Sequence, residues 1–429
     1  MNFKLALAAA AVVGLAGTAQ AADLAKKAPA AANYVKICDA YGAGYFYIPG
    51  SETCLKIGGY VRAELRTGNG GSYTPGGAPV YGINQSQRTG HAINTRARVN
   101  LNFDARTSTE MGLLRSYIEM WITNSSAQQG TTATNMEFNL RQAFVQFGGL
   151  TAGRAASFFD FVEGGYTYGN TPFEPDNSDH RVNLFAYTFS FGNGISASLS
   201  LEDKSTSDSS AITYLTGYNT YVGGVKYPDL VANVNISQAW GRAQVMAALR
   251  DNYGLTSAYG DKWGYAVGAG VEVNLPMLGA GDMAFLQAAY TEGALEYVLN
   301  NVVTSAAFSN IAVSDVRVNA TATGLVNTKA WSVSGGLKHN FSKAIEANLS
   351  GSYAAVDTSG YYTGGASAAM NDFHQYVLGG NLVWKPVSGL SIGADVGYKQ
   401  VEFSSAAKTT YGVNNVGSWM GTLRVQRSF

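Results

Sequence analysis

The chain has 429 residues with 29 basic and 29 acidic side chains, so its formal net charge is zero, and only 14% of its residues are charged. This balance argues against a general binder of nucleic acid or of anionic lipid. After the first 21 residues no apolar run approaches the roughly 18 residues that a membrane-spanning helix needs. The low charge suits a β-barrel, whose outer face meets lipid instead of water.

The first 21 residues have the pattern of a secretory signal peptide. Lys4 gives a positive start, residues 5–17 form a short apolar core, and Ala19-Gln20-Ala21 is a small-residue cleavage site. The apolar core is too short for a spanning helix, which disfavours an N-terminal membrane anchor. We therefore expect the mature chain to begin near Ala22 and to leave the cytoplasm.

The two cysteines, Cys38 and Cys54, lie close together within residues 22–55, which we expect to form a periplasmic segment. An even number of cysteines in an exported chain favours one disulfide. A zinc site would need more ligands than two cysteines and four scattered histidines provide. We expect a disulfide hairpin here, with no bound metal and no other cofactor.

From residue 56 to residue 429 the chain is a series of segments with a period of two. In the first, Val61 and Leu65 share one face, while Arg62, Glu64 and Arg66 share the other. Such alternation fits strands with one apolar and one polar face, in a soluble sandwich as well as in a barrel. The other segments are 94–105, 112–122, 139–147, 150–154, 182–191, 195–202, 230–239, 243–251, 263–275, 283–291, 330–340, 345–354, 373–385, 390–401 and 418–429.

The connections between these segments alternate in length. Connection 192–194 is followed by 203–228, and connection 386–389 is followed by 402–417. Short periplasmic turns and long outer loops are typical of membrane barrels. We count about sixteen strands and predict an all-β fold, a transmembrane antiparallel β-barrel over residues 56–429. A soluble exported β-protein remains the alternative.

One outer loop, about residues 155–181, is long and rich in aromatic and acidic side chains. Surface loops are commonly shorter and more polar. We therefore expect this loop to fold inward and to narrow the hole that the strands enclose. Phe158, Phe159 and Phe161 would anchor it to the inner wall, with stacking on sugars as the alternative.

Several stretches resemble a known family. They are residues 38–50, CDAYGAGYFYIPG, residues 54–62, CLKIGGYVR, residues 141–147 together with Gly153-Arg154, and residues 238–242, QAWGR. On these stretches the chain resembles the general porins of Gram-negative bacteria, most closely those of alphaproteobacteria. The resemblance implies a trimeric outer-membrane barrel of sixteen strands, with the third outer loop folded into the lumen. Departures in the loops leave pore size and solute preference open.

The candidate functional site is a constriction with opposite charges on its two sides. Its basic side would consist of inward-facing arginines: Arg62, Arg96, Arg98, Arg141 and Arg154, with Lys56, Arg66 and Arg115 as further candidates. Its acidic side would consist of loop carboxylates: Asp160, Glu163, Glu174, Asp176 and Asp179. Opposed charges across a narrow aqueous gap create a transverse field that sorts solutes by charge and dipole.

Each half of this site has an alternative interpretation. The arginines would also fit ordinary wall charges paired with Glu64 or Asp104. The loop acids would also fit an outer-surface loop that binds calcium or the counterions of lipopolysaccharide. The glycine-rich run 264–270 indicates either packing sites or room in the lumen.

The final strand and the aromatic residues add two expectations. The terminal Phe429 resembles the C-terminal signal by which outer-membrane proteins engage the barrel-assembly machinery. Tryptophan and tyrosine near strand ends predict an aromatic girdle at the membrane boundaries. The residues assigned to it are Trp121, Trp240, Trp263, Trp384, Trp419, Tyr290 and Tyr353.

Catalytic motifs are not found: the sequence has no HExxH, no GxSxG and no glycine-rich phosphate loop followed by Lys-Ser/Thr. His180 follows Asp179 in the long loop, but one Asp-His pair does not make a hydrolase. The predicted function is a water-filled outer-membrane channel for passive diffusion of ions and small hydrophilic solutes. The alternatives are a substrate-selective channel for sugars or peptides, and a non-conducting structural or adhesin barrel.

Overall fold

The structure is a computed structural model that describes most of the chain after residue 35. The described residues are 36–68, 93–126, 136–162, 166–168, 175–207, 224–254, 257–299, 314–319, 321, 323–358, 372–411 and 414–429. The expected signal peptide and the expected acidic residues Glu163 and Glu174 therefore lie outside the described residues.

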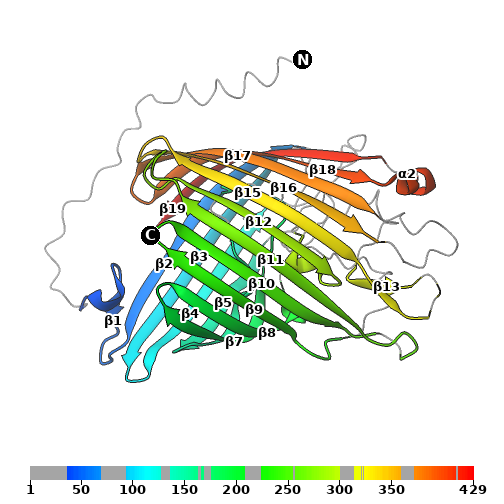
Figure 1. Ribbon diagram of the computed structural model, residues 1–429. Helices are drawn as coiled ribbons and strands as arrows, with labels where there is room; N and C mark the ends of the chain where they lie inside the picture. The colour runs from blue at the N-terminus through cyan, green and yellow to red at the C-terminus, as the bar shows by residue number, and fades with distance from the viewer. Residues whose placement is uncertain are drawn as a thin grey trace, which may run out of the picture.

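Sixteen antiparallel strands of the described chain form a closed barrel, because each pairs with the next and β19 pairs with β2. This confirms the predicted fold and strand number (Figure 1). The barrel strands are β2 (Cys54–Gly68), β3 (Ile93–Thr109), β4 (Gly112–Ser125), β5 (Met136–Phe147), β6 (Leu150–Ala156), β7 (Arg181–Gly192), β8 (Ile195–Asp203), β9 (Asp229–Gln238), β10 (Gly241–Asn252), β11 (Lys262–Asn274), β12 (Met283–Glu292), β15 (Lys329–Asn340), β16 (Ile345–Asp357), β17 (Phe373–Val387), β18 (Leu390–Phe403) and β19 (Val416–Ser428).

The remaining elements are short and lie in the connections. No helix within the described ranges is long and apolar enough to cross a membrane. These elements are η1 (Asp39–Tyr41), β1 (Phe46–Tyr47), η3 (Lys204–Thr206), η4 (Leu295–Tyr297), β13 (Val316–Val318), β14 (Leu325–Asn327) and α2 (Ser405–Tyr411).

The alternation read from the sequence corresponds to an outer apolar face and an inner polar face. In β8, Leu199 and Leu201 are 50% and 48% exposed, whereas the intervening Ser200 and the following Glu202 are each 1% exposed. Side chains of successive strand residues point to opposite faces, so the exposed set faces outward and the buried set faces the lumen. The outer surface is therefore suited to lipid.

The two ends of the barrel differ. Short turns such as 193–194 and 388–389 lie at one end, and long connections such as 157–180 and 204–228 lie at the other. Figure 1 shows β1 at the end with the short turns and α2 at the end with the long connections. The connection 157–180 is the third of the long ones, as expected.

The expected disulfide is present at the end with the short turns. Cys38 and Cys54 are bonded, with their Cα atoms 5.9 Å apart. Both cysteines are buried beside Tyr45, whose hydroxyl donates to Asp104 Oδ2 at 2.8 Å. The disulfide ties the segment before β1 to the first residue of β2.

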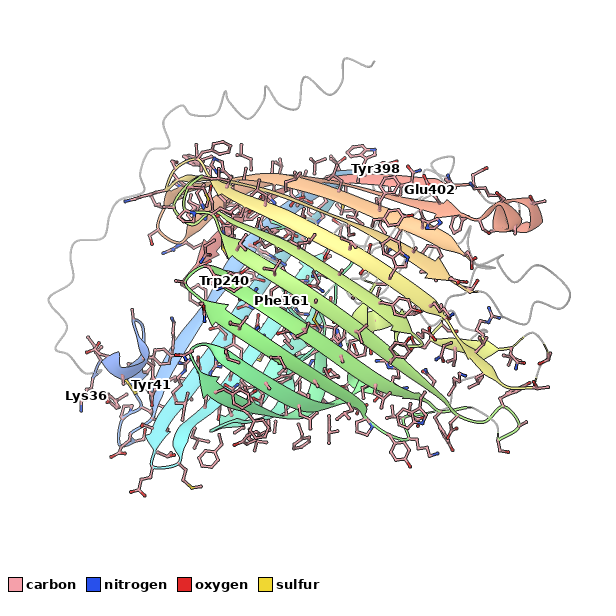
Figure 2. All side chains as sticks on the ribbon, in the orientation of Figure 1. Lys36, Tyr41, Phe161, Trp240, Tyr398 and Glu402 are labelled. Atoms are coloured by element: carbon pink, nitrogen blue, oxygen red, sulfur yellow. A yellow bond between two sulfur atoms is a disulfide. The ribbon has the colours of Figure 1, made fainter. Side chains whose placement is uncertain are left out.

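The aromatic girdle prediction holds for the outer face but is wrong for one residue. Trp240, Trp384 and Trp419 are each more than 40% exposed, and Figure 2 shows Trp240 at the end of the barrel that carries the short turns. Trp121 instead faces the lumen, because it shares a β4 face with Glu119 and Thr123 and not with the exposed Ile122.

Candidate pore constriction

The long connection 157–180, here called the inner loop, folds into the barrel as predicted. Its described residues are 157–162, 166–168 and 175–180. Phe159, Phe161, Val162 and Tyr166 are all buried, and they share one apolar cluster with inward side chains of β9 to β12. Figure 2 shows Phe161 midway along the barrel. The loop therefore covers one side of the inner wall.

Glycines in the wall make room for the aromatic rings of the inner loop. A β-carbon at Gly270 would lie 2.3 Å from Cδ1 of Phe161, and one at Gly393 would lie 2.7 Å from Cε1 of Tyr168. Contacts below 3.0 Å are not tolerated by real β-carbons, so only glycine fits these two positions without movement of the ring. The glycine-rich run 264–270 thus includes a packing site for the loop, which settles the choice left open by the sequence.

The loop begins on a buried carboxylate from β8. Glu202 accepts a hydrogen bond from Ser157 Oγ at 2.7 Å and another from the backbone N of Phe158 at 2.9 Å. Two residues later, the backbone carbonyl of Asp160 accepts from Nε2 of Gln244 at 3.1 Å. Polar contacts therefore fix the start of the loop, and the apolar cluster holds its middle.

Tyr166 and Tyr168 connect the inner loop to two parts of the wall, at β11 and at β18. Tyr166 donates to Oε2 of Glu272 at 3.3 Å, and burial, followed by the nearby carboxylate of Glu272, raises the pKa of its hydroxyl. Tyr168 donates through its backbone N to Asp395 at 3.0 Å and through its hydroxyl to Ser391 at 2.8 Å. The centroid of the Tyr168 ring lies 4.9 Å from the guanidinium carbon of Arg424.

The described loop carboxylates mostly brace the loop itself. Asp160 is 8% exposed and accepts from Ser178 Oγ and from the backbone N of His180. Asp176 is 1% exposed and accepts from Ser352 and from Gln375, and its charge attracts the buried ammonium group of Lys399. Buried carboxylates with such partners act as anchors for the returning chain.

Asp179 is the most accessible of the described loop acids. Its side chain is 19% exposed, and Oδ1 lies 2.9 Å from NH1 of Arg181. Arg181 also lies 3.9 Å from Asp160, so one arginine contacts a carboxylate near the start of the loop and another near its end. Asp160, Asp176 and Asp179, which we expected to line the acidic side of the constriction, make contacts that hold the shape of the loop.

A second chain segment, residues 294–299, also lies inside the barrel, and the sequence analysis did not predict it. The ring centroids of Tyr297 and Phe159 lie 4.8 Å apart, and the hydroxyl of Tyr297 donates to Asp229 Oδ2 at 2.8 Å. Burial and the charge of Asp229 raise the pKa of its hydroxyl, which therefore keeps its proton. We call residues 294–299 the inner brace.

Arg250 from β10 links the inner brace to the wall. Its guanidinium contacts Asp229 at the start of β9, Glu296 within the brace, and Oδ2 of Asp315 at 3.0 Å. The Arg250 side chain is 2% exposed. One buried cation thus joins three carboxylates from three separate parts of the chain, and the brace in turn supports the inner loop.

Opposite the inner loop, the wall formed by β19, β2 and β3 carries a concentration of arginines. Together with Arg141 on β5 we call them the arginine wall, which consists of Arg62, Arg66, Arg96, Arg98, Arg141 and Arg424. Glu64 lies at its centre with a fully buried side chain. Its oxygens lie 3.5 Å from Arg62, 3.1 Å from Arg66, 2.5 Å from Arg96 and 2.6 Å from Arg424.

Trp121 extends the arginine wall toward β5. The guanidinium carbon of Arg98 lies 4.0 Å from its ring centroid and that of Arg141 lies 4.3 Å away. A register shift between β4 and β5 occurs beside Arg141, where Glu119 faces Gln142 and Met120 faces Leu140. This β-bulge leaves Arg141 and Gln142 both on the lumen side. Guanidinium groups stack favourably on indole, which helps these cations lie close together.

One predicted basic residue does not belong to this wall. Arg154 pairs in register with Ala143 and Asn183 on the outward face, and it donates to the backbone oxygens of Leu140 and Thr206. The expectation that Arg154 faces the lumen is therefore wrong. The two-residue turn at Gly148-Gly149 places Leu150 opposite Phe147, so Arg154, four residues later, follows the outward face.

The contacts of three further arginines show which of them belong to the arginine wall. Arg115 belongs to a separate ion-pair group, because its Nε lies 2.8 Å from Oδ1 of Asp104, which also binds Arg106. Arg66 and Arg424 were not among the main predicted residues, although Arg424 lies between the outward Leu423 and Val425 and so had to face inward.

Among the described residues no group of three His, Cys, Asp or Glu side chains is placed to hold a metal ion.

Comparison with known proteins agrees with this architecture. A family model described as "Porin subfamily" matches residues 23–422. Over the full length of both chains, the protein is 29% identical to Porin Omp2b of Brucella canis and to Porin Omp2b of Brucella melitensis. The solved outer membrane channel DcaP of Acinetobacter baumannii has a TM-score of 0.67 at 15% identity, over 89% of this chain and 99% of that one.

A closed sixteen-stranded barrel with an apolar outer face and a loop in its lumen defines an outer-membrane porin, a channel for diffusion of solutes. The chain belongs to the porin subfamily whose model covers residues 23–422. The resemblance to the alphaproteobacterial general porins is thereby confirmed.

Proposed function

We propose that the passage between the inner loop and the arginine wall is the constriction that sorts ions and small hydrophilic solutes by size and charge. The observation that carries this proposal is the approach of Tyr168 to Arg424, which brings the loop to the edge of the arginine wall. The apolar cluster holds the rest of the loop against β9 to β12, so the polar side of the lumen is left for water and solutes.

Single-channel recording in a planar bilayer tests this proposal. Purified wild-type protein should give stable conductance steps, and Tyr168→Ala should raise the step size because it removes a ring from the edge of the passage. Tyr353→Ala is the matched control, since Tyr353 lies on the outer face with 40% exposure. Equal steps in the wild type and in Tyr168→Ala would remove Tyr168 from the constriction.

Membership of the family also supports several finer proposals. The protein acts as a homotrimer and not as an enzyme, and it takes no cofactor. Its signal peptide is cleaved after Ala21, residues 22–55 remain periplasmic, and Phe429 directs the last strand to the assembly machinery. The barrel then sits among outer-membrane lipid and lipopolysaccharide. A folded protein that conducts nothing would favour the alternative of a structural or adhesin barrel.

A further inference from the structure

We infer that this porin is anion-selective, and that the arginine wall is a track for small oxyanions carrying carboxylate or phosphate groups. The inference rests on the proposed constriction and adds the class of solute that it favours. Three observations support it. Arginines outnumber carboxylates at the arginine wall, the strand register places arginines next to one another, and the described acids of the inner loop contact groups outside this wall.

Among the described residues of this wall and its adjoining strands, arginines outnumber carboxylates. Six arginines form the wall, and Glu64 is the carboxylate that contacts four of them. Asp395, Glu119 and Glu137 on the adjoining strands bring the described carboxylates to four against six arginines, so the arginines remain in excess.

The register of the strands forces like charges together. Arg62 on β2 lies directly opposite Arg98 on β3, and Glu64 lies directly opposite Arg96 on one side and Arg424 on the other. Like charges directly opposite each other on a sheet destabilise it. A wall built this way keeps a positive potential, and a passing anion lowers the repulsion between its arginines.

The described acids of the inner loop do not face this wall as a matching row. Asp176 interacts with Ser352, Gln375 and the charge of Lys399 on the other side of the lumen. Asp160 and Asp179 both lie within 4 Å of Arg181. The described loop residue that meets the wall is Tyr168, which is neutral and contacts Arg424 through its ring.

The side-chain chemistry indicates which anions benefit. The planar guanidinium group binds carboxylate and phosphate oxygens through two parallel hydrogen bonds. Several guanidinium groups close together on a hydrated wall offer successive sites, and the ion moves on because no single site encloses it. Small phosphates and carboxylates should therefore pass more readily than neutral solutes of the same size.

The test is the zero-current potential of the wild-type channel in a potassium chloride gradient. We expect chloride to permeate at least about three times as readily as potassium. Arg98→Gln and Arg424→Gln should each lower this ratio, and the double variant should bring it close to one. Arg154→Gln removes the same charge from the outer face and should leave the ratio unchanged.

Uptake into proteoliposomes provides a second readout. Inorganic phosphate should enter the wild type faster than a neutral pentose, and the double variant should lose this difference while still admitting the pentose. If the glutamine variants fail to fold, the sign of the wild-type zero-current potential alone decides the question.

The outcomes separate this inference from the proposed function. A conducting channel that prefers potassium would overturn the anion track and leave the constriction in place. An equal loss of anion preference in Arg154→Gln would also overturn it, because the effect would then come from overall charge. Folded protein without any conductance would remove the proposed function itself.

Discussion

Phe161 of the inner loop lies over Gly270 of β11 so closely that a β-carbon there would lie 2.3 Å from Cδ1 of the ring. This contact between the loop and the wall is close van der Waals packing of an aromatic ring on a residue without a side chain. Replacing Gly270 with alanine should push the ring and the loop toward the open side of the lumen. We expect a smaller single-channel conductance and a loss of about 1–3 kcal/mol of stability, the usual cost of overfilling a packed site.

Gly421→Ala is the matched control for that substitution. Gly421 lies in β19, and the nearest heavy atom to an added β-carbon is 3.9 Å away. This variant should keep the wild-type conductance. A Gly270→Ala channel with wild-type conductance would show that the loop does not depend on the contact with Phe161.

A second prediction concerns Glu64, the acid at the centre of the arginine wall. Glu64→Gln leaves the surrounding arginines without the carboxylate that four of them contact. Removing one partner of a buried ion pair commonly costs about 3 kcal/mol. The temperature at which the folded barrel unfolds, read from its shift in electrophoretic mobility after heating, should fall.

Glu119→Gln is the comparison for that variant. Glu119 accepts hydrogen bonds from the amides of Asn100 and Gln142, which are neutral, so its replacement leaves no comparable group of cations. The fall in unfolding temperature should be clearly smaller. Equal falls in the two variants would count against a special role for Glu64.

A third prediction concerns Arg250, which joins the inner brace to the wall. Arg250→Leu leaves Asp229, Glu296 and Asp315 close together without their shared cation. Repulsion between the buried carboxylates should destabilise the inner brace at pH 7 and increase the noise of the open channel. Protonation removes that repulsion, so the variant should regain stability as the pH falls toward about 4.

The wild type keeps the shared cation of these carboxylates, so it should show no such gain of stability over the same pH range. Thermal unfolding of both proteins between pH 7 and pH 4 provides the measurement. Parallel curves for the two proteins would contradict the assignment of Arg250 as the link.

A fourth prediction concerns the disulfide between Cys38 and Cys54. The bond closes a loop with a sequence separation of 16, which the chain-entropy model values at about 3 kcal/mol. Reduction, or the double substitution with serine, should make residues 36–53 sensitive to chymotrypsin, which cleaves after aromatic residues such as Tyr41 and Tyr45. The conductance should stay unchanged, because the arginine wall does not include this segment. A changed conductance would mean that the segment touches the passage.

The pattern of the sequence was sufficient for the barrel and for much of its inner wall. Period-two alternation placed Arg62, Arg96 and Arg98 on one face, since each strand has one lipid-facing and one lumen-facing side. The same rule, applied across the Gly148-Gly149 turn, would have placed Arg154 outside. Applied to the last strand, it would have placed Arg424 inside.

Other features depend on contacts that no local pattern records. The inner brace has no distinctive period, and its burial depends on Phe159 and Arg250, which lie far from it in the sequence. The lumen position of Trp121 was missed because tryptophan near a strand end is also typical of a girdle. The bracing role of Asp160 and Asp176 was missed because a carboxylate in a loop looks the same whether it faces water or a buried donor.

The contacts of the inner loop also bear on the order in which the molecule forms. The backbone of Tyr168 bonds to Asp395, a separation of 227 residues, and Asp176 bonds to Gln375, a separation of 199. Contacts between such distant residues form slowly, and these two need the last strands to be in place. We therefore expect a newly closed barrel to be wide at first and to reach its final bore only when the loop docks. The width of the passage would then be the last property that the folding protein acquires.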